Sequence, residues 1–451
     1  MEKSKCKIYP EVYCNQCGKC VFYVNKEFFH VYGKKENPES DVYGLAFDLG
    51  STNLCGRLYN LSTGELTAGC SLENPQRLFG KDVITRQSYV LNHEEGQTTM
   101  HRLLIDGINR SAEFLLNYCN ISSRQIERIT AGGNTTISHF LLDLPVRGLA
   151  EIPFKPAFSD SVTISGGCLG LILDVPVYIP GNLGGHVGSD ITAGLLNDTL
   201  LNSDELTIYV DIGTNGEITL KEKDSYLVTS VAAGPVFEEG YLELGMNAVE
   251  GAITRVSIGR TVSVNTIGDK DPEGLCGSGI VSAISEMIKA GIVNREGRLS
   301  AYDEMKRRYA SKDILERIDE ENRRFYLTEK VYISGEDIRK FLLAKAALRA
   351  GITTLLKKRG KDESSIGKLV LTGAMGSHVT TEDLIRTGII PEPDKNKIEY
   401  LENGALEGLS LLLLEKCSHE KVEQIRASAE NVFLNETDEF EKEYIGEMVF
   451  K

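Results

Sequence analysis

Two short stretches of the sequence share one pattern, and this pair constrains the fold more than any other feature. Residues 47–53, FDLGSTN, and residues 210–218, VDIGTNGEI, each end an apolar run with an aspartate and then turn through glycine and small polar residues. Glycine has no side chain to keep a phosphate away from backbone N–H groups, and hydroxyls add donors. The aspartate can hold Mg²⁺ through water or orient an attacking water. Two such turns, about 160 residues apart, predict a duplicated α/β fold that holds one phosphate-bearing ligand from both sides.

Net charge and hydropathy argue against several classes of partner. Among the 451 residues, 50 are lysine or arginine and 65 are aspartate or glutamate, so the formal net charge is −15. This charge is unfavourable for binding a nucleic acid or an anionic membrane, whereas backbone amides and a metal ion can still hold a nucleotide. The most apolar stretch, residues 166–180, contains one aspartate and two prolines, so we expect no membrane span. The N-terminus has no apolar segment of signal-peptide length, and we expect a cytoplasmic protein.

Four of the ten cysteines lie in the first 20 residues. Cys14, Cys17 and Cys20 form a CX₂CX₂C triplet, the spacing that bacterial-type ferredoxins use for a four-iron cluster. A structural zinc site is the alternative, although zinc ligands more often form two separated CX₂C pairs. We therefore expect a [4Fe–4S] cluster in a small cysteine-rich module that, with its polar linker, comprises residues 1–38.

The fourth cluster ligand is left open by the spacing. Cys6 is the nearest candidate in the sequence, and we expect it to be the ligand. A remote cysteine such as Cys55 or Cys70, or a partner subunit, is the alternative. Three cysteines in apolar or helical surroundings are expected to be buried core thiols: Cys119, Cys168 and Cys417.

Three further glycine-containing segments occur in a fixed order around the two turns. Residues 186–194 form a glycine turn into a small-residue helix, residues 369–377 an apolar strand into a glycine pair, and residues 403–409 the start of another small-residue helix. The series resembles the five-part signature of the acetate kinase, sugar kinase, heat-shock chaperone and actin superfamily: phosphate 1, connect 1, phosphate 2, adenosine and connect 2. The resemblance implies a duplicated actin-like ATPase fold, with a first half at residues 39–205 and a second half at residues 206–451.

Longer phrases narrow the resemblance to one branch of that superfamily. They are NPQRLFGKDVITR at 74–86, GNTTISH at 133–139, AAGPVFE at 232–238 with Gly245 and Met246 behind it, and LCGSGI at 275–280. Together they resemble the reductive activators of corrinoid proteins, from about Tyr43 to the C-terminus. Familiar members carry a plant-type ferredoxin domain with a two-iron cluster. Here only about 40 residues precede the ATPase-like region, and they carry the cysteine triplet instead.

This resemblance implies an ATP-hydrolysing electron-transfer protein of an anaerobic methyltransferase system. Such activators use ATP and Mg²⁺ to drive an electron from an iron–sulfur cluster onto Co(II) of a corrinoid methyl-carrier protein, which restores Co(I). The implied partners are the corrinoid protein, an electron-donor protein such as a ferredoxin or flavodoxin, and a second copy of the chain in a homodimer.

Other functions share the same ATPase fold. The activators of 2-hydroxyacyl-CoA dehydratases also join it to a four-iron cluster, but they are shorter and lack the phrases at 74–83 and 133–139. A small-molecule kinase or a chaperone-like nucleotide switch would leave the cysteine triplet without an electron-transfer role.

The resemblance also assigns roles to residues of the motifs. Asp48 and Asp211 are expected to orient Mg²⁺ through water, and Asp190 stands where sugar kinases keep their catalytic base. Glu217 and Glu238 are the alternative acids. The expected nucleotide-binding residues are Gly50, Ser51, Thr52, Asn53, Gly213, Thr214, Asn215, Gly216, Gly234, Gly373, Ala374 and Gly376.

Three elements outside the motifs are predicted from periodicity. Residues 335–351 have the apolar face of a helix that ends at Gly351, and residues 303–330 are expected to be a solvated helical excursion. A strand at 432–434 and an amphipathic helix are expected at the C-terminal end.

Overall fold

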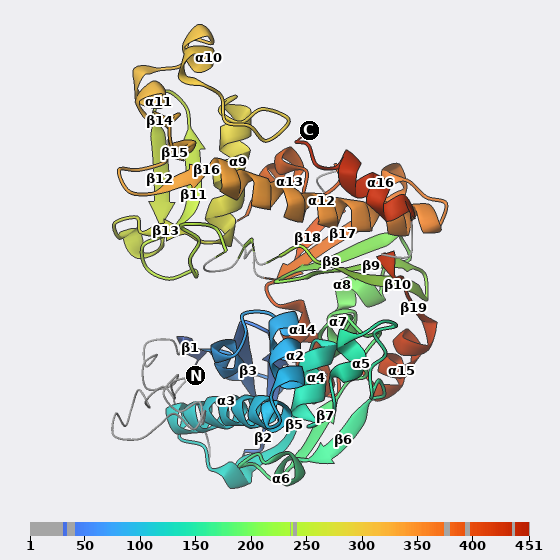
Figure 1. The fold of residues 1–451 in the computed structure, drawn as a ribbon. Coiled ribbons are helices and arrows are strands. Elements are labelled where there is room, and N and C mark those ends of the chain that lie inside the picture. Colours follow the sequence, from blue (N-terminus) through green and yellow to red (C-terminus); the bar gives the residue numbers. More distant parts are fainter. Residues whose placement is uncertain are drawn as a thin grey trace. The chain divides into compact units, whose positions relative to one another are not determined.

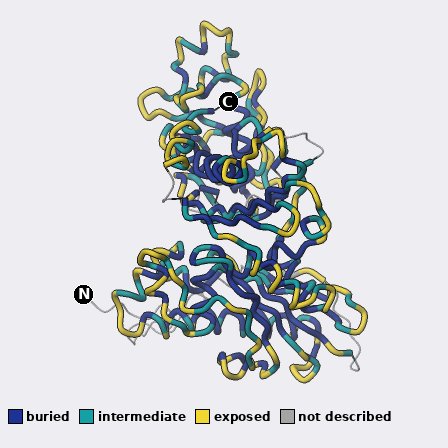
Figure 2. Tube along the Cα trace, turned by 90° about the vertical axis from the view of Figure 1, so that its right-hand side faces the viewer, coloured by how far each residue is buried: buried dark blue, intermediate teal, exposed yellow. Residues whose placement is uncertain are grey.

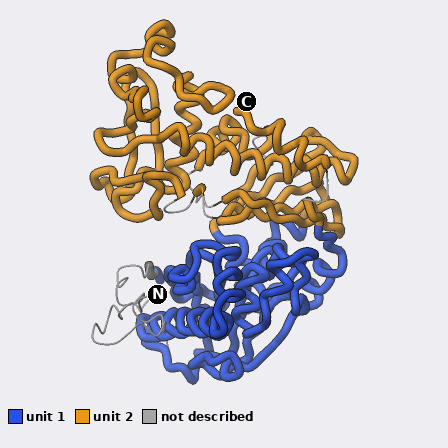
Figure 3. Tube along the Cα trace, viewed as in Figure 1, with its two compact units in different colours: residues 1–202, 403–431 blue, residues 203–402, 432–451 orange. Residues whose placement is uncertain are grey.

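The computed structural model describes residues 30–33, 41–234, 236–237, 241–373, 379–392, 397–434 and 438–450. The chain forms two compact units (Figure 3). The first ends at Asn202 and takes in Asn403–Asn431, and the second contains Ser203–Glu402 and the residues from Val432 onward. The predicted domain limits at residues 38 and 205 stay predictions; the segment at 403–431, predicted as part of the second half, lies with the first unit.

The first unit is built on a seven-stranded sheet in the order β1-β4-β3-β2-β5-β7-β6. Its strands and helices are β1 (His30–Gly33), β2 (Tyr43–Leu49), β3 (Asn53–Asn60), β4 (Leu66–Glu73), η1 (Pro75–Leu78), α2 (Val83–Asn92), α3 (Gly96–Cys119), η2 (Ser123–Gln125), β5 (Ile126–Gly133), α4 (Thr135–Leu141), α5 (Arg147–Ala150), β6 (Val162–Ser165), α6 (Gly166–Leu169), β7 (Pro176–Ile179), α7 (Ser189–Gly194), α8 (Asp198–Leu201), α14 (Gly404–Leu413), α15 (His419–Ser428) and β19 (Ala429–Asn431).

Alternation along β2 decides which helix covers each face of this sheet. Leu45 and Phe47 belong to one apolar core together with residues of α3. Ala46 belongs to a second cluster with residues of α7 and α14. Because successive strand side chains point to opposite faces, Asp48 at the end of β2 shares the face of α14 with Ala46. The buried strands appear dark blue in Figure 2.

The second unit contains a mixed sheet in the order β18-β17-β8-β9-β10 and two three-stranded sheets, β12-β11-β13 and β14-β15-β16 (Figure 1). Its elements are β8 (Thr207–Ile212), β9 (Gly216–Glu222), β10 (Ser225–Val231), β11 (Ala252–Ile258), β12 (Val262–Thr266), η3 (Ile267–Asp269), β13 (Gly274–Leu275), α9 (Gly277–Lys289), α10 (Tyr302–Arg307), α11 (Lys312–Glu316), β14 (Ile318–Asp319), β15 (Arg324–Tyr326), β16 (Tyr332–Ser334), α12 (Gly335–Lys358), η4 (Glu363–Ser365), β17 (Lys368–Gly373), α13 (Thr381–Thr387), β18 (Ile398–Tyr400) and α16 (Asp438–Gly446).

The predicted helix at 335–351 is confirmed, but it continues to Lys358 as α12. Gly351 does not end the helix; it lies inside, where a Cβ would come within 2.5 Å of Ile218 Cδ1, so its small size lets α12 approach β9 closely. Ser334 caps the start of α12, because its hydroxyl accepts from the Asp337 amide while the Asp337 carboxylate accepts from the Ser334 amide.

Two other expectations, about residues 303–330 and about the C-terminal end, are corrected. Residues 303–330 form two short helices, α10 and α11, and then a β-hairpin with Phe325 fully buried, because Phe325 alternates with the more polar Arg324 and Tyr326. At the C-terminal end the helix is confirmed as α16, but the strand is β19, at 429–431 and not at 432–434. Among the described residues, no helix combines the length and apolarity that a membrane span needs.

Candidate functional site

Two parallel strands bring the first expected phosphate turn next to a second loop. Leu49 of β2 lies beside Gly133 of β5, so the turn of Gly50, Ser51 and Thr52 and the loop after β5 leave the sheet at the same edge. The Asn134 side chain joins the two: its Nδ2 donates to Ser51 Oγ at 2.9 Å. Its Oδ1 accepts from the Ile137 amide at 3.0 Å and so caps α4. Asn53, also expected to bind nucleotide, begins β3 directly after the turn.

Asp48 lies on the α14 side of this edge. Asn403 caps α14 through a bond from the Leu406 amide to its Oδ1 at 2.8 Å, and its Nδ2 donates to Asp48 Oδ2 at 2.8 Å. Burial raises the pKa of Asp48 to about 6, although the bond from Asn403 and the charge of Arg57 act in the opposite direction. The carboxyl group is therefore partly buried, oriented by an amide donor, and has a pKa above its ordinary value.

Asp190 reaches the same edge through close backbone packing. The Gly133 amide donates to Ser189 Oγ at 3.0 Å, and a Cβ on Gly188 would lie 2.3 Å from Asn134 Cα, so the start of α7 fits against the β5 loop. Asp190 is in the first turn of α7, where its Oδ1 accepts from the Ile191 amide at 2.8 Å. The structure thus brings Asp48, Asp190 and the turn at 50–53 to one edge of the first unit.

The second unit gathers its motifs in the same way. Turn residues Gly213, Thr214 and Asn215 join β8 to β9, with the Gly213 amide donating to the Asn215 carbonyl at 2.9 Å. Val231 at the end of β10 lies opposite Gly216, so Gly234, which has φ +75°, follows at this edge of the sheet. Parallel strand β17 ends there too, with Gly373 beside Ile212.

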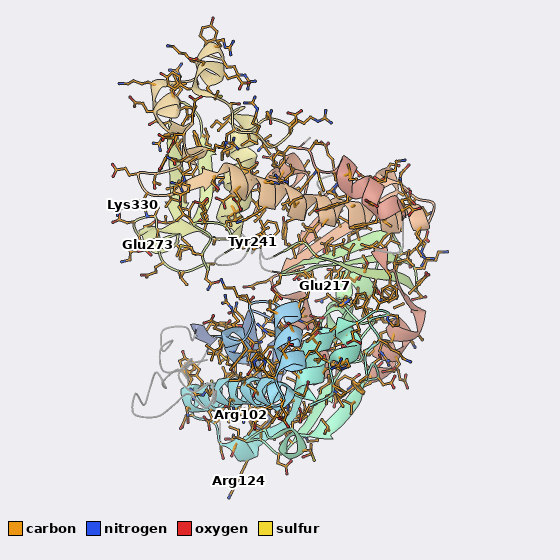
Figure 4. The ribbon with its side chains drawn as sticks, in the orientation of Figure 1. Arg102, Arg124, Glu217, Tyr241, Glu273 and Lys330 are labelled. Atoms are coloured by element: carbon orange, nitrogen blue, oxygen red, sulfur yellow. The ribbon has the colours of Figure 1, made fainter. Side chains whose placement is uncertain are left out.

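Two carboxylates and one glycine crowd the end of β8. Asp211 and Glu217 are directly opposite each other on β8 and β9, so their side chains share a face, and Ser230 Oγ donates to Glu217 Oε1 at 3.1 Å. Glu217 is labelled in Figure 4. A Cβ on Gly373, which has φ +101°, would lie 2.4 Å from Asp211 Oδ1. Only glycine fits this position, because both its backbone conformation and its contact with Asp211 exclude a side chain. Expected nucleotide-binding residues Ala374 and Gly376, and the alternative acid Glu238, lie outside the described residues.

Sequence patterns missed how several residues support the first turn. Asn134 and Asn403 stood in the quoted motifs without an assigned role, although an asparagine before a small-residue helix is a typical cap. Asn74 and Arg86, both fully buried, donate to carbonyls of the turn itself.

The cysteines divide into those outside and those inside the described residues. The predicted cluster ligands, Cys6, Cys14, Cys17 and Cys20, lie outside them. In the described part of the chain, no three histidine, cysteine, aspartate or glutamate side chains form a group that could hold a metal ion. The core-thiol expectation is confirmed for Cys119, which is buried; Cys417 is half-buried, and Cys168 is exposed on α6, so the expectation was wrong there.

Two family profiles match this chain, one in each half of the sequence. Residues 43–203 match the profile of the RACo middle region, and residues 205–451 match that of the C-terminal domain of RACo, the ASKHA domain. ASKHA is the superfamily of acetate and sugar kinases, heat-shock chaperones and actin that the glycine motifs resemble, so the predicted α/β fold is confirmed.

Two curated proteins and one solved structure are similar over most of the chain. Corrinoid activation enzyme RamQ from Eubacterium limosum is 31% identical over an alignment of 409 positions, which covers 85% of this chain and 65% of RamQ. The Co(II) methylated amine-specific corrinoid protein reductase from Methanosarcina barkeri is 24% identical over an alignment of 455 positions, which covers 91% of this chain and 77% of that protein. The solved structure of a reductive activator for corrinoid, iron–sulfur protein has a TM-score of 0.82 at 31% identity, over 92% of this chain and 67% of that one.

Proposed function

This chain belongs to the RACo family, and from that premise we propose that it is an ATP-dependent reductive activator of a corrinoid protein. In this reaction an electron passes from an iron–sulfur cluster to Co(II) of the partner and restores Co(I). The observation that carries the proposal is the similarity of residues 43–451 to reductive activators, together with acid-bearing glycine turns at one sheet edge of each unit. The chain spans 65% of the length of RamQ, so activity, substrate and partner are all proposals for this protein.

ATP and Mg²⁺ are proposed to bind at the two acidic turns. Main-chain amides of residues 50–53 and 214–216 would hold phosphate oxygens, and Gly213 would line the turn without a side chain, because glycine turns let such oxygens approach the backbone. Asp48 and Asp211 would hold Mg²⁺ through water. Asp211 lies opposite Glu217, so two carboxylates are close together at this turn, and carboxylate oxygens are ligands that Mg²⁺ favours. Asp190 would orient the attacking water. Gly234, Gly373, Ala374 and Gly376 would receive the adenosine.

A [4Fe–4S] cluster is proposed on Cys6, Cys14, Cys17 and Cys20, where it would supply the low-potential electron. The described cysteines favour Cys6 over the two remote candidates. Cys55 on β3 and Cys70 on β4 both lie within the sheet of the first unit. Both thiols also have neighbours in the sheet and on α3: Cys55 Sγ is 3.5 Å from Ser71 Oγ, and Cys70 Sγ donates to the Ser111 carbonyl at 3.9 Å. A ferredoxin or flavodoxin is the proposed donor, and a homodimer the proposed assembly.

Reduction of the partner is the decisive test. Anaerobically purified full-length chain is mixed with a Co(II) corrinoid protein from the same organism, a chemical reductant and Mg-ATP, and the Co(II) and Co(I) absorption bands are followed. We expect Co(I) to appear only when chain, reductant and ATP are all present. Formation of Co(I) at the same rate without ATP, or no Co(I) with the full mixture and any corrinoid protein of that organism, would contradict the proposal.

Metal analysis tests the cluster separately. Cys14→Ala, Cys17→Ala and Cys20→Ala should each remove most of the iron and visible colour. The matched control, Cys168→Ala, changes an exposed cysteine on α6 and should keep the full iron content. Zinc without iron or sulfide in anaerobically purified wild type would disprove the cluster.

A further inference from the structure

Three successive carbonyl groups of the turn after β2 are bound by one segment of the first unit. Asn74 Nδ2 donates to the Gly50 carbonyl at 2.8 Å, and the Asn74 amide donates to the Thr52 carbonyl at the same distance. Between them, Arg86 Nη2 donates to the Ser51 carbonyl. All three carbonyl oxygens of the turn are therefore held by donors from residues 74–86.

Local structure explains how these two side chains reach the turn. Glu73, the last residue of β4, lies opposite Asn53, so Asn74 emerges directly beside the turn. The Oδ1 of Asn74 accepts from the Gln76 amide at 2.9 Å and caps η1. This bond orients the side-chain amide so that its Nδ2 can donate to the Gly50 carbonyl. The Asp82 side chain caps α2, and this fixes the first turns of the helix that carries Arg86.

The Arg86 guanidinium is itself held by neutral oxygens around it. Its Nε donates to the Gly80 carbonyl at 2.9 Å, and its Nη1 donates to Gln76 Oε1 at 3.2 Å. Gln76 is oriented in turn because its Nε2 donates to the Met100 carbonyl of α3 at 2.8 Å. Asn74, Gln76 and Arg86 are all 0% exposed, and a buried charge is tolerated only when it is well hydrogen-bonded. Three fully buried polar side chains thus lie beside one short turn.

Peptide geometry links these bonds to phosphate binding. In a trans peptide the C=O and the N–H point in opposite directions, so the bonds to the Gly50 and Ser51 carbonyls direct the amides of Ser51 and Thr52 away from Asn74 and Arg86. We propose that Asn74 and Arg86 are positioning residues that keep these two amides aimed at the phosphates of the nucleotide. This inference rests on the proposed nucleotide binding.

Two substitutions disturb the turn in different ways. Asn74→Asp keeps the shape and the Oδ1 cap, but replaces the donor to the Gly50 carbonyl with an oxygen that repels it. Arg86→Met removes the guanidinium and keeps an apolar chain of similar length. Arg77→Met is the matched control, because Arg77 belongs to the same phrase but pairs with Glu73 at 2.6 Å. All four proteins are full-length and anaerobically purified, and Kd is measured by calorimetry for Mg-ATP and for AMP.

We expect Kd for Mg-ATP to rise at least tenfold in Asn74→Asp and Arg86→Met, while Kd for AMP, which lacks the outer phosphates, changes less than threefold. The control should match the wild type for both ligands. Hydrogen exchange gives a second readout: saturating ATP should protect the amides of residues 50–53 in wild type but not in Asn74→Asp. A loss of packing alone would not separate ATP from AMP.

The outcomes separate this inference from the proposed function. Wild type that binds ATP, with both variants within twofold of it or with equal losses for ATP and AMP, overturns the inference and leaves the proposed function standing. Wild type that binds no ATP overturns both. If Arg86→Met does not fold, Asn74→Asp decides the matter by itself.

Discussion

At the residue scale, the partly buried Asp48 carboxyl makes stability depend on pH. Its pKa is raised from 3.8 to about 6 in the folded state, so ionisation costs more in the fold than in the unfolded chain. Its contribution to the free energy of unfolding is therefore full below pH 4 and is lost as the pH rises to about 6, by up to about 3 kcal/mol. Asp48→Asn removes this loss and keeps an acceptor for Asn403.

We expect the free energy of unfolding of Asp48→Asn, relative to wild type, to rise by about 2–3 kcal/mol between pH 4 and pH 7. Urea unfolding without nucleotide or magnesium measures it, because a bound cation would stabilise the ionised carboxylate. A difference that stays constant over this pH range would mean that Asp48 has an ordinary pKa.

The carboxylate of Asp190 is expected to matter for the rate of ATP hydrolysis and little for binding. A positioned general base contributes ~10²–10⁴-fold, so Asp190→Asn should lower kcat by about that factor and leave Kd for ATP nearly unchanged. Asp198→Asn is a suitable control, since Asp198 is an exposed acid in the first turn of the neighbouring short helix α8. If Asp190→Asn hydrolyses ATP at the wild-type rate, another acid such as Glu217 must orient the water.

At the element scale, the end of β17 depends on a glycine. Gly373→Ala would place a Cβ 2.4 Å from Asp211 Oδ1 in a backbone conformation with φ +101°. We expect a loss of about 1–3 kcal/mol in stability and at least a tenfold weaker affinity for ATP, because Asp211 must move. Gly360→Ala separates the effect of a positive φ from the effect of the contact with Asp211. Gly360 has φ +64°, but a Cβ there has no neighbour within 4 Å. Calorimetry should show weaker ATP binding for Gly373→Ala alone; equal affinity in both variants would contradict the role of Asp211.

The sequence predicted those elements whose cause is local. The acidic turns, the strand before Gly373 and the helices α7, α12 and α14 follow patterns that lie within a few residues, and Ser334 and Asn403 cap α12 and α14. It did not predict the bond between Asp48 and Asn403, because these residues are 355 positions apart and meet only when α14 packs on β2. The role of Arg86 could not be predicted for the same reason, because nothing in its helix indicates that it binds a turn 35 residues earlier.

At the scale of the whole molecule, the proposed reaction needs energy that a cluster alone does not supply. For a one-electron transfer, ~59 mV corresponds to a factor of ten, or about 1.4 kcal/mol. An uphill gap of ~200 mV would thus require roughly 4–5 kcal/mol. A nucleotide can supply this only if it binds two states of the activator–partner complex with different affinities.

Linkage of this kind is reciprocal, so the partner must also change how the activator handles ATP. We expect ATP hydrolysis to be slow for the chain alone, and to rise at least tenfold when the Co(II) corrinoid protein is added. The Co(I) and methylated forms, which are products and not substrates of the activator, should bind weakly and stimulate little. Phosphate release is measured anaerobically while each form is titrated. The Cys17→Ala variant is the control, because without the proposed cluster it has no electron to transfer. Equal stimulation by all three cobalt forms would show that hydrolysis does not sense the cobalt state, and the coupling between ATP and electron transfer would have to be abandoned.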